Sequence, residues 1–121
     1  PTMLEFIERV GSPAVGLMWD PSHLWRANED PAETLSLVKD HVLRCVCAIR
    51  GECQKAVDPA EIQIPGNGAL NWVHIVMQLR AIRGLGIWVI EINQMRDWSP
   101  ERMRDVLARA RVSLEHLLAR A

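Results

Sequence analysis

The chain alternates between stretches with helical periodicity and short apolar runs. In the helical stretches, apolar residues recur every three or four positions, which is the spacing of one helix face. We expect helices over residues 3–10, 31–39, 72–83 and from 100 to near the C-terminus. The apolar runs have the length and composition of buried strands, and we expect strands at 14–20, 43–49 and 87–92. Strands separated by single helices predict an α/β fold with three parallel strands and four helices.

Capping residues support these helix boundaries. Good N-cap residues precede each helical stretch: Thr2, Asp30, Asn71 and Ser99. Asp30 is followed by Pro31 and, two residues later, by Glu33, which is the arrangement of a capping box. Residues 52–68 contain several prolines and glycines and predict a long loop, and loops of this length are usually functional or mobile.

Polar residues gather where the predicted strands end. Asp20 closes the first strand, Pro21 cannot extend its hydrogen bonding, and His23 is expected in the loop above. Glu91 lies late in the third strand. Ligands of β-α sheets bind at the carboxyl ends of the strands. Adjacent parallel strands are about 4.8 Å apart, so the two carboxylates could converge on a hard cation, Mn²⁺ or Mg²⁺.

Composition narrows the function classes. The chain has 121 residues, which suits one domain over 1–121 but not a closed (β/α)8 barrel of about 250 residues. Its 14 basic and 15 acidic residues argue against nucleic acid or an anionic membrane as partner. No apolar run approaches the roughly 18 residues of a membrane span, and no signal peptide is visible. An odd set of cysteines, Cys45, Cys47 and Cys53, favours a reduced, cytoplasmic protein.

The stretch GLMWDPSHLWRANEDPAETL, residues 16–35, resembles the sixth strand, loop and helix of the xylose isomerase-like TIM barrels, the sugar phosphate isomerase/epimerase superfamily. The Asp-x-x-His-x-x-Arg pattern of Asp20, His23 and Arg26 is typical of that group. The resemblance extends along the whole chain and covers the second half of such a barrel. It therefore implies a half-barrel domain.

The resemblance also implies a site. Members of the family bind a divalent metal through an Asp on the sixth strand, a His on the seventh and a Glu on the eighth, with a Glu from an earlier strand. Carried over, Asp20 and Glu91 are metal ligands and catalytic carboxylates, and His23 and Arg26 contact substrate. The segment RCVCAIRG, residues 44–51, aligns with the family's RHVHVKDG, so Cys47 stands at the metal-binding histidine position.

Other positions depart from the family pattern. Cys45 replaces the neighbouring His, Ile49 and Arg50 replace a Lys-Asp pair, and PGNGALNW, residues 65–72, resembles LGEGDVPW without its two acidic side chains. A thiolate is a poor substitute for imidazole toward Mn²⁺ or Mg²⁺. The family isomerises or epimerises sugars by proton transfer next to a carbonyl.

Each candidate residue also has a structural interpretation. The alternatives are that Asp20 forms only a turn, that His23 bonds to backbone, and that Glu91 pairs with Arg96 or Arg50. Cys45 and Cys47 are expected as small core residues rather than ligands. The tryptophans are expected in the core rather than as a platform for stacking sugars: Trp19, Trp25, Trp72 and Trp88.

Three functions therefore stay open. The first is a metal-dependent sugar isomerase or epimerase, inactive until the barrel is completed. The second is a catalytically silent half-barrel used for binding or assembly. The third, nucleic-acid processing, is disfavoured by the absence of a basic patch. Open strand edges predict a homo-oligomer or a complex with a separate N-terminal half-barrel chain.

Overall fold

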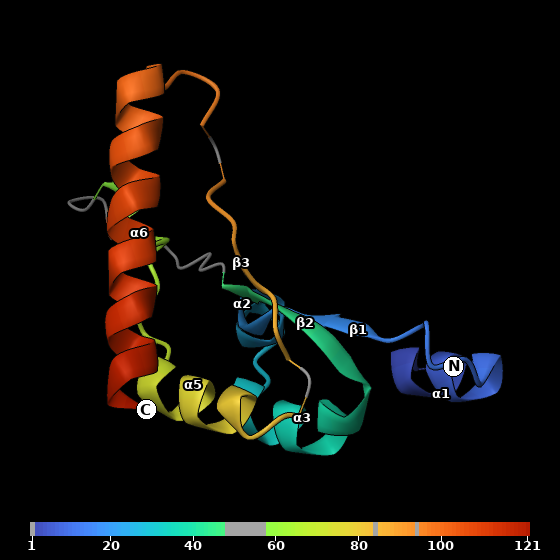
Figure 1. The fold of residues 1–121 in the computed structure, drawn as a ribbon. Helices are drawn as coiled ribbons and strands as arrows, with labels where there is room; N and C mark the ends of the chain where they lie inside the picture. Colours follow the sequence, from blue (N-terminus) through green and yellow to red (C-terminus); the bar gives the residue numbers. More distant parts are fainter. Residues whose placement is uncertain (1, 48–57, 84, 94) are drawn as a thin grey trace.

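The computed structural model describes residues 2–47, 58–83, 85–93 and 95–121 (Figure 1). The elements follow in the order α1 (Met3–Val10), β1 (Leu17–Trp19), α2 (Pro21–Arg26), α3 (Pro31–Val38), the 3-10 helix η1 (Lys39–His41), β2 (Val42–Cys47), α4 (Pro59–Ile62), α5 (Trp72–Arg80), β3 (Trp88–Ile90) and α6 (Pro100–Arg120). Four of the described helices, α1, α3, α5 and α6, have eight or more residues.

The three strands form one parallel sheet with β2 in the middle, as the alternation of strands and helices predicted. Trp19 pairs with Cys45, which pairs on its other side with Trp88. Because all three strands run the same way, their carboxyl ends meet at one edge of the sheet. Asp20 leaves β1 at that edge and Glu91 leaves β3 there.

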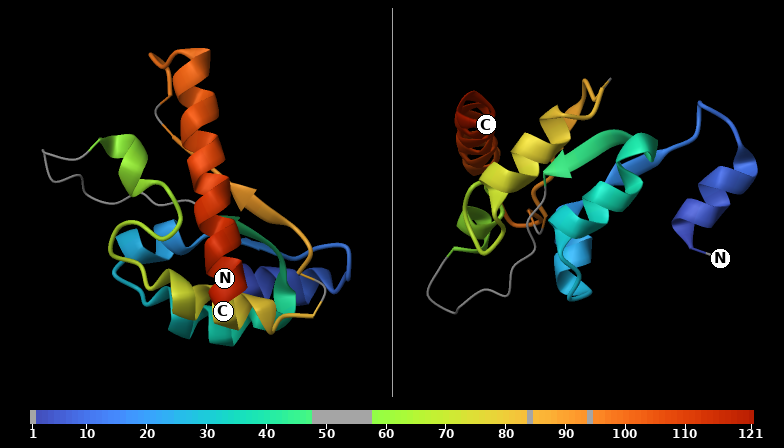
Figure 2. Two further views of the ribbon diagram at one scale, coloured as in Figure 1. Left: turned by 60° about the vertical axis from the view of Figure 1, so that its left-hand side comes forward. Right: turned by 90° about the horizontal axis from the view of Figure 1, so that it is seen from below.

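Helices α3, α5 and α6 pack against one face of this sheet (Figure 2). The main core joins strand residues to helix residues: Trp19, Val42, Cys45 and Cys47 with Leu35, Trp72, Ile75, Val76, Leu79, Leu114 and Leu117. A second cluster lies under the first half of α6, where Ile64 and Ile92 contact Val106 and Ala110. The apolar stripe predicted for the last helix is therefore the side that packs on the sheet.

Helix α1 lies beyond β1, away from α3, α5 and α6 (Figures 1 and 2). Its boundaries are the predicted ones: Thr2 and Glu5 form a full capping box, and Gly11 ends the helix at φ 63°. Ile7 is its only buried residue, and Met3, Phe6 and Val10 are exposed. The apolar side of α1 is therefore largely open to solvent.

Several local predictions are corrected. Residues 21–26 form the short helix α2 instead of a loop, because Asp20 and Pro21 together make a helix start. His23 is therefore helical. The predicted loop 52–68 contains the short helix α4, and its residues 63–68 are turns and bends as predicted. Residues 52–57 of that loop, with Cys53, fall outside the described residues, as do Ile49 and Arg50.

The strand and tryptophan predictions are corrected as well. The first and third strands are three residues each, so Glu91 follows β3 rather than lying within it. Trp19 and Trp72 are buried as predicted, but Trp25 is 45% exposed. In α3, Asp30 accepts from the N–H of Ala32 rather than from that of Glu33. Among the described residues, no helix combines the length and apolar character needed to cross a bilayer.

Candidate functional site at the strand ends

Asp20 is held in place by the helix that follows it, α2. Its Oδ1 accepts a hydrogen bond from the backbone N–H of Ser22 at 2.8 Å, which caps α2. Its Oδ2 lies 3.4 Å from Nε2 of His23. The side chain of Asp20 is only 13% exposed, whereas that of His23 is 67% exposed. The carboxylate is therefore fixed within the fold, and the imidazole beside it faces solvent.

Arg26 ends the same short helix and is exposed. It follows His23 by three residues, a spacing that places two side chains on neighbouring positions of a helix. The structure thus brings Asp20, His23 and Arg26 onto one turn-and-helix unit that follows β1. The three residues of the sequence motif share this one local element.

Glu91 follows β3 and is exposed. In the described part of the chain no ion pair joins it to Arg96, the structural alternative expected from the sequence. Its neighbours both pack toward the helices: Ile90 packs against both core clusters, and Ile92 is buried within the second. Successive side chains of an extended segment alternate in direction, so Glu91 belongs to the opposite side of the sheet.

Cys47 lies on the helix-packed face. It pairs with Ile90 in the sheet, and both it and Cys45 have no exposed surface. Both are free thiols within the main core. A hydrogen bond with the Cys47 thiol, together with burial, raises the pKa of the Cys45 thiol far above its ordinary value, and the charge of Asp20 adds to this shift. The prediction of small core residues is confirmed for these two cysteines.

The register separates Cys47 from the two carboxylates. Asp20 follows the buried Trp19, and Glu91 follows Ile90, so alternation puts both carboxylates on the side away from Cys47. They belong to strands with β2 between them, which corresponds to a backbone separation of about 10 Å. The described residues therefore offer a cation two widely separated carboxylates, which supply oxygen ligands only and do not complete a coordination shell.

The carboxylates of Asp20 and Glu91 are suitable ligands for a divalent metal, but two ligands are too few to form a site. Carboxylate oxygens suit Mn²⁺ or Mg²⁺. Among the described residues, however, no group of three or more His, Cys, Asp or Glu side chains could hold a metal ion. Asp20 and Glu91 therefore do not complete a metal site by themselves.

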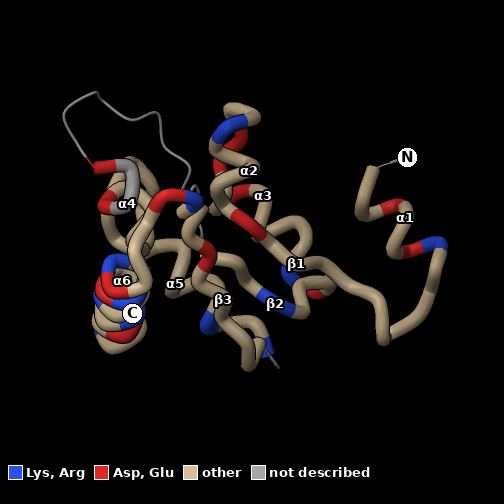
Figure 3. Tube along the Cα trace, turned by 90° about the horizontal axis from the view of Figure 1, so that it is seen from above, with Lys and Arg blue, Asp and Glu red and all other residues tan. Residues whose placement is uncertain are grey.

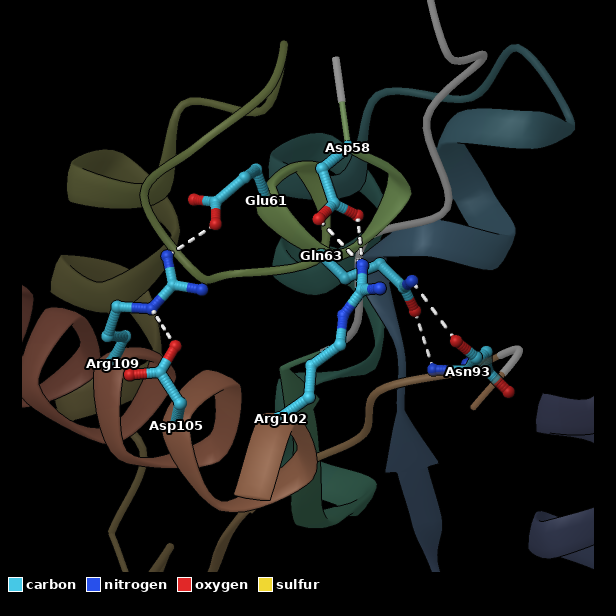
Figure 4. Close-up of polar contacts among 7 residues, drawn as sticks. All are labelled: Asp58, Glu61, Gln63, Asn93, Arg102, Asp105 and Arg109. Carbon is cyan, nitrogen blue, oxygen red and sulfur yellow. Dashed lines mark hydrogen bonds and ion pairs between the residues drawn. The ribbon is translucent and has the colours of Figure 1, made fainter. Parts of the chain in front are cut away.

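A hydrogen-bonded bridge fixes the segment that follows Glu91 (Figure 4). The side-chain amide of Gln63 donates from Nε2 to the carbonyl oxygen of Asn93 at 3.2 Å, and its Oε1 accepts from the N–H of Asn93 at 2.6 Å. Gln63 is only 6% exposed. The loop before α5 is thus tied to the chain two residues beyond Glu91.

Two arginines of α6 tie the same loop to the helix (Figure 4). Arg102 donates from Nη2 to both carboxylate oxygens of Asp58, at 2.9 and 2.7 Å, and stacks over Trp98. Arg109 bonds Glu61 through Nη1 and Asp105 through Nε, and these contacts raise its pKa. In the same way the Ser113 hydroxyl of α6 donates to the carbonyl oxygen of Pro65, so residues 58–65 are anchored along the helix.

The charged side of α6 is its solvated face, and its arginines are exposed. Figure 3 shows both signs of charge along this helix. The partners of Arg102 and Arg109 on the α4 segment were not predicted, because they are more than forty residues away in sequence. Gln63 was missed as well, because its partner Asn93 is thirty residues away and nothing in the sequence around Gln63 signals its burial.

Comparison with known proteins agrees with the observed sheet. A model of the xylose isomerase-like TIM barrel family matches residues 1–117. No curated protein matches the chain.

Proposed function

Because the chain belongs to the xylose isomerase-like TIM barrel family, we propose that it is a barrel segment of the sugar isomerase or epimerase type. In this proposal Asp20 and Glu91 are the carboxylates that act on a sugar or sugar phosphate, and His23 and Arg26 contact it. The reaction class is aldose–ketose isomerisation or epimerisation, in which a proton moves next to a carbonyl.

The observation that carries the proposal is the anchoring of Asp20. Its carboxylate is largely buried, points from the end of a parallel strand and is fixed by the N–H of Ser22. Parallel sheets bind ligands at this edge, and preorganised charges are more effective there than mobile ones. A residue that served only to form a turn would not need the exposed His23 beside its second oxygen.

The residues suit separate tasks. Glu91 is exposed at the strand end, so its carboxylate can take a proton from a ligand. His23 can donate or accept a hydrogen bond with a sugar hydroxyl. The guanidinium of Arg26 suits a phosphate. A divalent metal, when bound, would polarise sugar oxygens, and Asp20 and Glu91 are the residues that would hold it.

The remaining ligands must come from beyond the described residues. We therefore propose that the site is completed by association, either with a second copy or with a separate N-terminal half-barrel chain. Both β1 and β3 are edge strands, and large apolar side chains near them are exposed, including Met18, Leu43 and Ile87. Open edges and exposed apolar surface favour pairing with another chain.

Native mass spectrometry in manganese-containing ammonium acetate tests this proposal, because it reports subunit number and bound metal together. We expect an oligomer that carries Mn²⁺. Asp20→Asn and Glu91→Gln should each weaken Mn²⁺ binding by about tenfold or more, the loss of one charged ligand. Cys47→Ala and the exposed control Glu101→Gln should leave it unchanged. Unchanged affinity in Asp20→Asn would exclude Asp20 as a ligand.

The second candidate is a catalytically silent binding or assembly module. The burial of Cys47 and the two-carboxylate donor set favour it. A metal-free oligomer that shows no turnover of aldose or ketose phosphates would support this function over the first. Turnover lost in Glu91→Gln would decide for the enzyme.

A further inference from the structure

A pocket lies apart from the strand-end carboxylates, between the α2–α3 turn and the start of α5. Its volume is about 390 Å³, within the range of small-molecule sites. Neither Asp20, His23 nor Glu91 lines it. Its polar and aromatic lining comes from Trp25, Asn28, Glu29, Asp30, Asn71 and His74.

Trp25 is the aromatic wall of this pocket. Trp25 is the fifth residue of α2 and was expected in the core, yet 45% of it is exposed. In contrast, Trp19, just before α2, is 4% exposed, and Trp72, at the start of α5, is 2% exposed. An exposed indole beside a hollow offers a flat apolar surface to a ligand.

The opposite walls are held by backbone bonds. Asn28 adopts a left-handed conformation at φ 57°, and the N–H of Glu29 returns to the carbonyl of Leu24 at 3.0 Å. Oδ1 of Asp30 accepts from the N–H of Ala32 at 2.8 Å, which leaves Oδ2 as an acceptor. Oδ1 of Asn71 accepts from the N–H of His74 at 3.2 Å, which leaves its amide N–H₂ as a donor.

The balance of these groups selects a ligand class. Glu29 and Asp30 are acidic, and no Lys or Arg is among the described residues that line the pocket, so an anion such as phosphate is repelled. A simple cation would use the carboxylates but not the amide donors of Asn28 and Asn71, which point to a ligand that also accepts hydrogen bonds. Hydroxyl groups both donate and accept, so a hydroxyl-rich ligand can use both sets.

We propose that this pocket binds a neutral, hydroxyl-rich ligand of the size of a sugar ring, stacked on Trp25. Its hydroxyls donate to the carboxylates of Glu29 and Asp30 and accept from the amide of Asn71. This site goes beyond the proposed function, since it uses none of the strand-end residues and excludes the phosphate that Arg26 would accept.

Nuclear magnetic resonance of the ¹⁵N-labelled chain tests the proposal through the indole N–H of Trp25, identified by its absence in Trp25→Phe. The probes are D-glucose and myo-inositol, compared with glucose 6-phosphate and tetramethylammonium. We expect saturable shifts with at least one neutral probe. Trp25→Ala should weaken that binding by about tenfold, the value of one aromatic stack, and Trp25→Phe should stay within about threefold of wild type.

Two control variants separate this site from its surroundings. Leu37→Ala removes an apolar side chain of α3 that is 76% exposed and does not line the pocket, so binding should not change. Asp20→Asn should also leave it unchanged, whether or not the strand-end proposal holds. Binding of neither neutral probe, tighter binding of tetramethylammonium or glucose 6-phosphate, or wild-type affinity in Trp25→Ala would overturn the proposal.

Discussion

Gln63 and Asn93 form a two-point bridge in which a side chain substitutes for a strand. The amide of Gln63 donates to the carbonyl of Asn93 and accepts from its N–H, at 3.2 and 2.6 Å. This is the pairing that a neighbouring backbone would supply in a sheet. The bridge joins the loop before α5 to the chain that has just left β3, and so it fixes the backbone beside Glu91.

Removing this bridge should destabilise the fold. Gln63→Met keeps the length of the side chain but deletes both hydrogen bonds, leaving two backbone groups of Asn93 without these partners. We expect the free energy of unfolding to fall by about 1–3 kcal/mol, measured by urea denaturation. Gln63→Ala should cost more, because it also leaves a cavity. A Met variant as stable as wild type would show that water replaces the bridge.

Two glycines make a matched pair for backbone packing. A Cβ at Gly16 would lie 2.6 Å from the carbonyl oxygen of His41 and 2.6 Å from Cγ of Leu43, closer than atoms can approach. Gly16→Ala should therefore lower the free energy of unfolding by about 1–3 kcal/mol. A Cβ at Gly86 meets nothing within 4 Å, so Gly86→Ala should be neutral or stabilising by up to about 1 kcal/mol. Equal effects in thermal unfolding would contradict this close approach of Gly16 to His41 and Leu43.

The structural task of Asp20 can be separated from its proposed chemical one. Asp20→Ala removes the cap of α2 and should cost about 1 kcal/mol, whereas Asp20→Asn keeps an oxygen acceptor for the N–H of Ser22 and should cost little. Asp40→Ala, at an exposed position in η1, should change stability by less than about 0.5 kcal/mol. If Asp20→Asn costs as much as Asp20→Ala in urea denaturation, the charge rather than the cap stabilises the fold.

Cys45 should make stability fall at high pH. Its folded pKa is raised, chiefly by the hydrogen bond with Cys47 and by burial, so the folded chain retains a proton that the unfolded chain releases. Stability from this group is complete below the unfolded pKa of about 8.5 and declines above it, by at most about 1.4 kcal/mol per pH unit. Urea denaturation from pH 8 to 10 measures the slope.

The control for this slope is Cys45→Ala, which cannot titrate there. Its stability will be lower at every pH because a buried side chain is lost, so the slopes are compared and not the absolute values. The variant should show a shallower decline than wild type. Parallel curves would mean that other groups cause the alkaline loss of stability.

The sequence by itself determined the four long helices, the three strands and their order, but not the short helices α2, η1 and α4. Periodicity located the long helices, and the residues Thr2, Asp30, Asn71 and Ser99 cap them as predicted, because capping depends on neighbours within a few positions. The parallel sheet followed from the strand–helix alternation. The burial of Cys45 and Cys47 followed from residue type.

Only the tertiary structure decided which side chains meet. The bridge from Gln63 to Asn93 and the clamp from Arg102 to Asp58 span thirty or more residues, and no local pattern encodes such partners. The same holds for Trp25, whose exposure depends on how α2 and α5 leave a hollow between them. The register of the strands placed Cys47 on the face away from Asp20 and Glu91. A shift of one residue would have moved these side chains to the opposite faces of the sheet.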